Sequence, residues 1–158
     1  SSVASLVAAT LGVSARDTDA DVEQQAGADV ADIFFDHGEG HFRELERAAV
    51  ARALGEHDGV LALGGGAVLD STTRTALRPH RVVFLDVGLA EASRRVGLSA
   101  SRPLLLGNVR GQLKALLDQR RALYVEVADH VVGTDGRTLD AVTADVVALL
   151  DTPVPGPP

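Results

Sequence analysis

A continuous apolar run that stops at three glycines constrains the fold more than any other feature of the sequence. Residues 59–63 read GVLAL, and Gly64-Gly65-Gly66 follows directly. An apolar run without polar alternation is typical of a strand buried on both faces, as strands are in a parallel sheet covered by helices. Residues 81–87, RVVFLDV, and residues 130–134 are two further strand candidates. These runs predict an α/β domain with a parallel sheet.

The segments between the apolar runs carry hydrophobic residues at helical spacing. Within residues 2–11, Val3, Leu6 and Val7 recur as they would on one face of a helix. Strands that alternate with such segments indicate βαβ units, and a helix that opens an α/β domain is expected to follow a strand. Further helices are expected as two short pieces within 20–36, from Gly38 to about residue 54, and over 70–78, 88–95, 110–127 and 139–150.

The composition limits the class of protein. A chain of 158 residues suggests one domain, expected over 1–150, followed by a Pro-rich tail or linker over 151–158. The net charge of −7 disfavours a nucleic-acid binder, which needs basic residues to neutralise phosphates. The absence of Cys excludes disulfides and thiolate metal sites, and no run approaches the roughly 18 apolar residues that cross a bilayer. We therefore expect a cytoplasmic protein that binds neither nucleic acid nor membranes.

Six short motifs occur in a fixed order along the chain. Each alone has little specificity, but in this order and at this spacing they closely resemble shikimate kinase, over essentially the whole chain up to Leu150. The motifs are Asp17-Thr18-Asp19; Ala31-Asp32-Ile33-Phe34; Gly38-Glu39 with Phe42, Arg43 and Glu46; Leu63 to Val68; Arg102-Pro103-Leu104-Leu105; and Arg120 with Tyr124.

The resemblance implies a three-layer P-loop kinase fold with a parallel sheet and a mobile lid over about 97–109. It also implies ATP as phosphoryl donor, Mg²⁺ as cofactor, shikimate as acceptor, and a monomer as the working unit. In the family, a central strand and the loop GxxxxGK[ST] precede the first helix, and Ser1 aligns with the residue just after the P-loop lysine. The strand and the loop are thus absent from this chain, which is expected to be impaired in ATP binding. Lys114, in a predicted helix, cannot replace that lysine, and the absence of an initial Met suggests a longer gene product.

By resemblance, five side chains form the acceptor site, and a sixth holds one of them in place. Asp19 would hold the 3-hydroxyl of shikimate and accept its proton; the alternative is an acidic turn before a helix, where Asp caps are common. Arg43 and Arg120 would clamp the carboxylate of shikimate, because two guanidiniums give both charge and orientation. Glu46, one turn after Arg43, would fix its rotamer, unless the two form a surface pair. Phe34 and Phe42 would line the pocket, although periodicity alone makes them core residues.

The remaining candidates concern the glycines, the nucleotide and the metal. Gly64, Gly65 and Gly66 end a strand where α/β sheets bind ligands, and they let backbone N–H groups approach a substrate; the alternative is a tight turn. Ser1 and Asp17 would lie near Mg²⁺, and an extended 17–19 segment would leave both aspartates on one side of the strand. By resemblance, Arg102 would reach the transferring phosphate from the lid, Arg95 would contact the nucleotide, and Arg137 would lie near the adenine.

Two other functions remain open from the sequence. Another small-molecule P-loop kinase, such as a gluconate kinase, would share the phosphate machinery but not the Arg43/Arg120 clamp together with Gly64 to Gly66. A noncatalytic remnant that binds a ligand without ATP is the second alternative, motivated by the absent P-loop. His37 and His41 have a metal-like spacing, but the glycines between them favour a polar surface turn over a zinc site.

Overall fold

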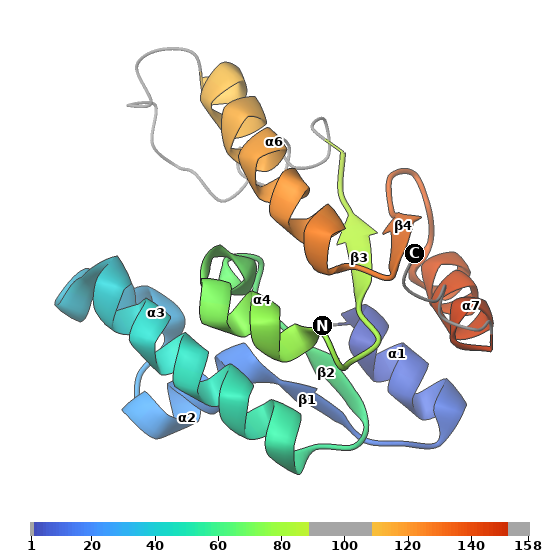
Figure 1. Ribbon diagram of the computed structural model, residues 1–158, viewed down its shortest axis with the longest axis horizontal. Coiled ribbons are helices and arrows are strands. Elements are labelled where there is room, and N and C mark those ends of the chain that lie inside the picture. Colours follow the sequence, from blue (N-terminus) through green and yellow to red (C-terminus); the bar gives the residue numbers. More distant parts are fainter. Residues whose placement is uncertain (1, 89–108, 152–158) are drawn as a thin grey trace.

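The computed structural model describes residues 2–88 and 109–151, and Figure 1 shows them as an α/β arrangement. Ser1, Arg95, Arg102, the predicted helix after 88, the predicted lid up to residue 108 and the tail from 152 lie outside the described residues. The helices and strands run in the order α1 (Ser2–Leu11), β1 (Ala15–Asp17), α2 (Thr18–Ala26), α3 (Val30–Glu56), β2 (Val60–Ala62), the 3-10 helix η1 (Ala67–Leu69), α4 (Ser71–Leu77), β3 (Val83–Asp86), α6 (Val109–Val127), β4 (His130–Gly133) and α7 (Leu139–Leu150).

The strands form two parallel pairs. Strand β1 pairs with β2, with Arg16 opposite Leu61, and β3 pairs with β4, with Phe84 opposite Val131. The prediction of parallel strands between helices is confirmed, but the described strands make two two-stranded sheets instead of one. Strands β2 and β3 each have a single hydrogen-bonded neighbour within the described part of the chain.

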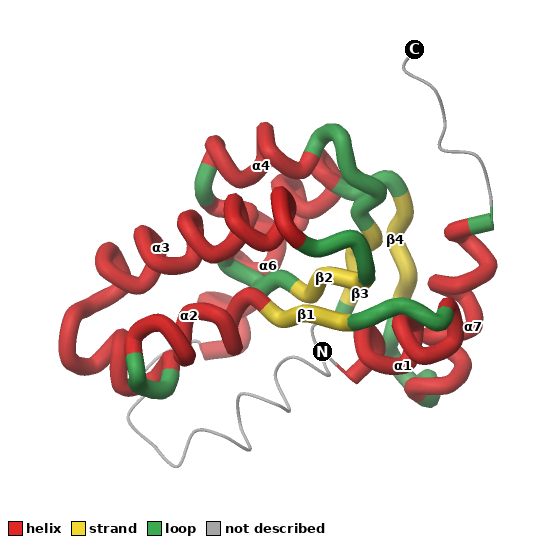
Figure 2. Tube along the Cα trace, turned by 90° about the horizontal axis from the view of Figure 1, so that it is seen from below, coloured by secondary structure: helices red, strands yellow, loops and turns green. Residues whose placement is uncertain are grey.

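Helix α1 connects the two pairs of strands. Its buried Val7 belongs to an apolar cluster with Val132, Val142 and Val146, and side chains of both β2 and β3 pack against this cluster. Figure 2 shows α1 and α7 on one side of the strands, with α3 and α4 on the other. A second cluster holds α2 to α3 and consists of Val22, Ile33, Phe42 and Ala49. The two clusters thus stabilise different parts of the molecule.

A glycine breaks the long helix α3. Gly38 has φ 83° and ψ 171°, a conformation that is open in practice only to glycine. The residues before and after it are helical, which agrees with the predicted helix start after Gly38. The break brings Phe34, from the first piece, against Phe42, from the second, with ring centroids 4.6 Å apart.

The described helices contain no segment that is both long and apolar enough to cross a membrane. The predicted helix over 2–11 has the same bounds as α1, and the predicted helix over 139–150 has the same bounds as α7. The 3-10 helix η1 was not predicted; it continues the turn made by the three glycines.

Candidate active site

The glycine turn after β2 meets the start of α2 and the middle of α3. A Cβ placed on Gly64 would lie 2.9 Å from Oδ1 of Asp19 and 3.2 Å from Oε2 of Glu46. Any side chain at Gly64 would therefore displace one of these carboxylates. Asp19 and Glu46 approach the backbone of the turn closely because Gly64 leaves that space open.

The next two glycines are covered from two other directions. A Cβ on Gly65 would lie 3.2 Å from the hydroxyl of Tyr124 and 3.8 Å from Nη1 of Arg120, both on α6. A Cβ on Gly66 would collide with the guanidinium of Arg43, on α3. The two arginines predicted to clamp a carboxylate thus lie over adjacent residues of one turn. The glycines are more than a tight turn, because each faces a polar or charged side chain at short range.

Asp19 is a partly buried acid with unused hydrogen-bonding capacity. Its Oδ1 is buried and has no hydrogen-bond partner among the described residues. Burial raises the pKa of Asp19, and the negative charges of Asp17 and Glu23 raise it further, while Arg43 acts in the opposite direction. A carboxylate oxygen left open in this way can accept a proton from a bound hydroxyl group.

The local backbone around Asp19 differs from the extended segment considered above. Only Asp17 is in the strand; it caps α2, and its side chain accepts a hydrogen bond from the N–H of Asp19 at 2.9 Å. Thr18 starts the helix, is fully buried, and donates to the carbonyl of Ala62 in β2 at 3.4 Å. Asp17 thus caps α2, and this cap holds Asp19 in the first turn of the helix.

Arg43 is held by carboxylates and aromatic rings on its own helix. Its Nη1 donates to Oε1 of Glu46 at 2.7 Å, and its Nε donates to Glu39 at 3.4 Å. The guanidinium lies 5.3 Å from the ring centroid of Phe42 and 6.0 Å from that of Phe34, within the range of cation–π contacts.

Glu46 is buried, with 5% of its side chain exposed, so the pair that it forms with Arg43 is not a surface pair. Burial raises the pKa of Glu46, whereas the hydrogen bond and charge of Arg43 lower it in part. A buried carboxylate that binds one guanidinium nitrogen fixes the orientation of the whole side chain. Arg43 can then present its remaining nitrogen, Nη2, to a ligand.

Arg120 lies on α6 and approaches the turn at Gly65, next to the glycine that Arg43 covers. Its Nε is buried and has no hydrogen-bond partner within the described part of the chain. The charge of Arg120 also acts on Glu46, which places the two side chains in one electrostatic cluster. An unpartnered guanidinium N–H beside a glycine turn is a donor for an anionic ligand.

Phe34 and Phe42 belong to both the core and the site. Phe42 is 3% exposed and is a member of the α2–α3 cluster, and Phe34 packs against that cluster. Both rings also lie within reach of the Arg43 guanidinium. This packing places Phe42 in the core with Phe34 against it, and their role as walls of a substrate pocket stays a prediction.

Of two predicted nucleotide or metal residues, Asp17 adjoins this cluster through Asp19, and Arg137 lies away from it. Asp17 borders a cavity of about 380 Å³ together with Ser2, Ser5 and Ala62, beneath the start of α1. Arg137 is held against α7, where it donates to the carbonyl of Ala141 at 3.2 Å and to Asp145 at 2.7 Å. The structure therefore brings together the acceptor residues but leaves Arg137 outside them.

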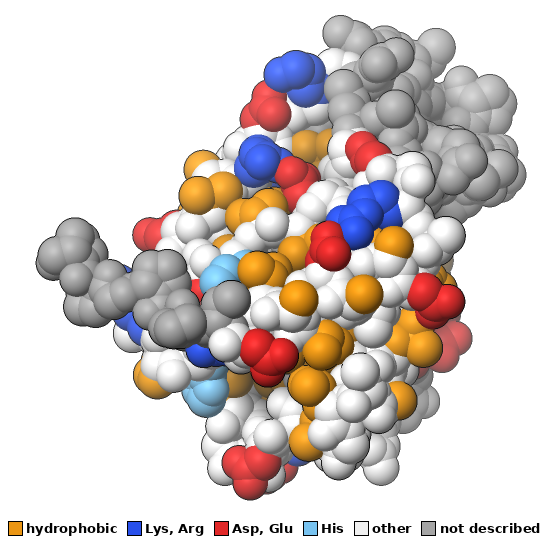
Figure 3. All heavy atoms as spheres, turned by 90° about the vertical axis from the view of Figure 1, so that its right-hand side faces the viewer, with side chains coloured by type: hydrophobic (Ala, Val, Ile, Leu, Met, Phe, Trp, Pro, Cys, Tyr) orange, Lys and Arg blue, Asp and Glu red, His pale blue; other side chains and the backbone are white. Residues whose placement is uncertain are grey.

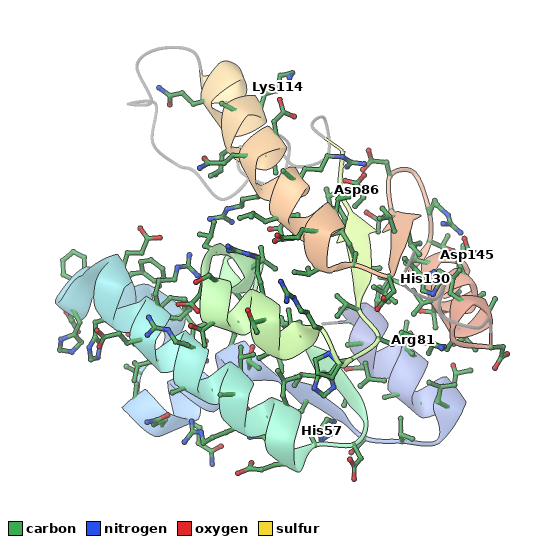
Figure 4. All side chains as sticks on the ribbon, viewed as in Figure 1. His57, Arg81, Asp86, Lys114, His130 and Asp145 are labelled. Carbon is green, nitrogen blue, oxygen red and sulfur yellow. The ribbon has the colours of Figure 1, made fainter. Side chains whose placement is uncertain are left out.

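Lys114 does not approach the glycine turn. Figure 4 shows it on the part of α6 that lies farthest from β3, with Asp86 at the end of that strand. Its Nζ pairs with Asp118 at 2.6 Å on the helix surface. The prediction that this lysine cannot take the place of a P-loop lysine is consistent with that position.

The model of the family described as shikimate kinase matches residues 1–151. The chain belongs to the shikimate kinase family. A shikimate kinase of Salinispora arenicola is 57% identical over 148 residues, which cover 94% of this chain and 89% of the relative. One of Frankia casuarinae is 58% identical over 139 residues, which cover 88% of this chain but 62% of that longer relative.

Solved structures of the shikimate kinase family agree with the fold. The shikimate kinase from Acinetobacter baumannii in complex with shikimate superposes with a TM-score of 0.83 at 30% identity, covering 94% of this chain and 84% of the other. The enzyme from Aquifex aeolicus gives a TM-score of 0.75 at 26% identity, covering 95% of this chain and 87% of the other. The P-loop kinase fold expected from the sequence is confirmed.

Tyr124 is the site residue whose role the sequence did not reveal. Its hydroxyl donates to the carbonyl of Gly65 at 2.5 Å, and its ring stacks on Phe84 with centroids 4.5 Å apart. The available signal was its spacing, because a residue four positions after Arg120 lies on the same face of a helix.

Proposed function

We propose that this chain carries the acceptor site for the ATP-dependent phosphorylation of shikimate on its 3-hydroxyl. The observation that supports this most is the convergence of Asp19, Arg43 and Arg120 on the three glycines Gly64 to Gly66. The family takes ATP as its phosphoryl donor, and the reaction transfers the γ-phosphoryl group to an alcohol. The product, shikimate 3-phosphate, belongs to the biosynthesis of aromatic amino acids.

The proposed acceptor contacts follow from charge and from open hydrogen-bonding groups. Shikimate carries one carboxylate, which Arg43 and Arg120 bind from two sides of the turn. The hydroxyl that attacks the γ-phosphorus faces Asp19, whose open Oδ1 accepts its proton as the new P–O bond forms, while the bond from the γ-phosphorus to the β–γ bridging oxygen breaks and ADP leaves. Phe34 and Phe42 pack against the carbon ring of the substrate. Such positioning supplies most of the catalysis in phosphoryl transfer.

The glycine turn supplies backbone donors to the same substrate. Neither the N–H of Gly65 nor that of Gly66 has a hydrogen-bond acceptor among the residues that the structure describes. In a turn that is otherwise bonded, two open N–H groups side by side suit the oxygen atoms of a polyhydroxylated acid. These donors distinguish oxygen-rich acceptors from apolar ones.

The nucleotide side of the proposal concerns Mg²⁺ and arginines. Asp17 is a hard oxygen donor of the type that Mg²⁺ takes; Oδ1 caps α2, and Oδ2 has no hydrogen-bond partner among the described residues. Ser1 is the second proposed ligand. A bound Mg²⁺ would supply counter-charge to the phosphates. Arg102 is proposed to contact the transferring phosphate, Arg95 to contact the nucleotide, and Arg137 to lie near the adenine.

We also propose that the protein works as a monomer in the cytoplasm.

The test compares this chain with an extended chain, in which the family strand and the loop segment GxxxxGK are joined ahead of Ser1, so that Ser1 takes the Ser or Thr position of the loop. Shikimate is titrated calorimetrically into both proteins, with and without MgADP, and phosphorylation by the extended chain is followed with ATP. We expect the extended chain to bind both ligands and to phosphorylate shikimate. Failure of a folded extended chain to bind shikimate would contradict the proposal.

A substrate panel separates the alternative kinase. Gluconate and quinate are offered beside shikimate at the same concentrations, with Arg120→Ala as the variant that weakens the clamp. We expect a strong preference for shikimate that falls in the variant. A preference for gluconate would favour the gluconate-kinase alternative, and binding without any transfer by the extended chain would favour a noncatalytic binder.

A further inference from the structure

Tyr124 lies at the centre of the proposed site without a role in the reaction. The phenol hydroxyl donates to the carbonyl oxygen of Gly65 at 2.5 Å. The same hydroxyl would lie 3.2 Å from a Cβ on Gly65, so it sits directly over that residue. A tyrosine whose ring stacks on another ring and whose hydroxyl is hydrogen-bonded has little conformational freedom.

The bond to Gly65 fixes the plane of one peptide group. The described chain has no cis peptide bond, so the Gly65–Gly66 peptide is trans. In a trans peptide, the N–H of Gly66 points in the direction opposite to the C=O of Gly65. When Tyr124 holds that oxygen toward α6, it also fixes the direction of the Gly66 N–H, which is one of the two open donors.

Glycine makes this constraint necessary. A peptide between two glycines can rotate easily about the bonds that flank it, because neither residue has a Cβ to restrict φ and ψ. The turn itself is bonded at its two ends, from Ala67 N–H to the Gly64 carbonyl at 3.1 Å and from Leu69 N–H to the Gly66 carbonyl at 3.1 Å. The carbonyl of Gly65 is held by the side chain of Tyr124 instead.

Other contacts keep α6 in place independently of this hydroxyl. Arg121 pairs with Asp86 at the end of β3, and Arg74 of α4 pairs with Glu126 at 3.0 Å. The ring of Tyr124 stacks on Phe84 at an interplanar angle of 24°. Removal of the hydroxyl alone therefore leaves the helix docked.

We propose that Tyr124 is a positioning residue for the acceptor, which orients the Gly66 N–H toward the substrate through the carbonyl of Gly65. This inference rests on the proposed function, because it assumes that shikimate binds over the glycine turn. It predicts a defect that is specific to the acceptor, since the hydroxyl contacts neither the capping residue Asp17 nor helix α1.

The test is Tyr124→Phe in the extended chain, which removes the hydroxyl and keeps the ring. We expect the shikimate Kd and KM to rise about three- to tenfold, the range for loss of one hydrogen bond. The KM for ATP, the kcat and the thermal midpoint stay close to those of the parent, because a uniform binding contact was removed. Thr75→Ala, which removes an exposed hydroxyl on α4, is the matched control.

A second variant separates positioning from packing. Phe84→Leu removes the stacking partner and leaves the phenol hydroxyl in place. We expect it to lower the thermal midpoint more than Tyr124→Phe does while raising the shikimate KM less. Equal rises of the shikimate and ATP KM values in Tyr124→Phe would overturn the inference, as would a shikimate Kd equal to that of the parent.

The tyrosine also provides a direct optical readout. The 158 residues contain one Tyr and no Trp, so if the added segment is chosen without either residue, tyrosine emission reports on Tyr124 alone. Saturating shikimate should change the tyrosine emission of the parent chain. The Tyr124→Phe variant lacks this tyrosine emission and should show no such change. Calorimetric binding without any change in emission would contradict the inference. A folded parent that binds no shikimate would instead refute the proposed function, so the two failures are distinguishable.

Discussion

The α1–β4–α7 cluster and the α2–α3 cluster are built from the same kinds of side chain but are bordered by different ones. The first contains Val7, Val132, Val142 and Val146, and its described neighbours are other valines and leucines. The second contains Phe42, which lies beneath the Arg43 guanidinium, one turn from the buried Glu46. One apolar cluster serves packing, and the other also forms a wall of the proposed site.

The polar atoms beside the two clusters point to the same difference. Near the α2–α3 cluster, the unpartnered buried atoms belong to a carboxylate and a guanidinium, Asp19 and Arg120. On the β4–α7 side they belong to the imidazole of His130 and the hydroxyl of Thr143. Buried charged groups with unpartnered hydrogen-bonding atoms lower the stability of a protein. Their position beside the three glycines is explained if a ligand binds there.

The surface over α1 and α7 fits a packing role. Figure 3 shows that side of the molecule with acidic and basic side chains spread among apolar ones. Val131 and Leu139 lie on β4 and α7 and are 46% and 52% exposed. Single exposed apolar residues of this kind are normal on a soluble surface.

The largest effect is expected at Asp19. In the extended chain, Asp19→Asn should lower kcat about 10²–10⁴-fold, because the variant cannot accept the proton of the attacking hydroxyl. Its stability should rise at neutral pH. Burial raises the pKa of Asp19, so its ionisation destabilises the folded parent. The free energy of unfolding of the parent therefore falls as the pH rises through the folded pKa of Asp19. Kinetics and urea unfolding at pH 4 and 7 check both parts; equal stabilities of parent and variant at pH 7 would contradict the second.

Arg43 and Arg120 should separate stability from binding. Arg43→Ala leaves Glu46 buried without its partner and should lower the free energy of unfolding by about 3 kcal/mol. Arg120→Ala should leave stability nearly unchanged, because Arg120 Nε has no described partner to lose, but it should weaken shikimate binding about 10–100-fold. Urea unfolding and calorimetry measure the two quantities.

The double variant Arg43→Met/Glu46→Leu is the control for this comparison. It should recover most of the lost stability, because it removes both buried charges, and should still not bind shikimate. If Arg120→Ala were as unstable as Arg43→Ala, Arg120 would be structural and the assigned clamp would be wrong.

The other cluster should respond in the opposite way. Val142→Ala truncates a side chain that is 2% exposed in the α1–β4–α7 cluster and should lower the free energy of unfolding by about 1–3 kcal/mol. The shikimate KM should not change at a temperature where the variant is folded. A raised KM with normal stability would show that this cluster also shapes the site.

The smallest effect is expected at the start of α4. Asp70 caps this helix, and although partial burial opposes the shift, the N–H of Thr73 and the charge of Arg47 lower the pKa of Asp70. Asp70→Ala should therefore lower the free energy of unfolding by about 1 kcal/mol at pH 7. That loss is present above the unfolded pKa of about 4 and disappears as the pH falls through the lower folded pKa. Asp70→Asn keeps the capping acceptor but loses the charge that pairs with Arg47, so its stability at pH 7 should lie between those of the parent and Asp70→Ala; thermal unfolding of the three proteins from pH 2 to 7 tests this.

The sequence predicted elements well where a local signal marks them. The helix after Gly38, the break near Gly27 and the turn at the three glycines all follow from glycine conformations or apolar runs. The burial of Glu46 could not be predicted, because an i,i+3 pair looks the same on a surface and in a core. The same holds for the conformation of Asp19: the acidic triplet is compatible with a strand and with a helix cap.

Contacts between distant segments were the hardest to predict. Tyr124 bonds to a carbonyl 59 positions earlier, and no pattern in its own helix indicates that partner. Arg137 was expected near the nucleotide from its place after the last strand, but its described contacts are with its own strand end and α7. Side-chain partners of this kind depend on how α6 and α7 pack, and local spacing does not determine that packing.

The central claim is that α2, α3 and α6 build one shikimate site on the glycine turn. The most direct test is calorimetric titration of shikimate into the extended chain and its Arg120→Ala variant, with circular dichroism to confirm that both are folded. We expect saturable one-to-one binding by the parent and a Kd about 10–100-fold higher in the variant. Equal binding by both proteins, or none by a folded parent, would contradict it.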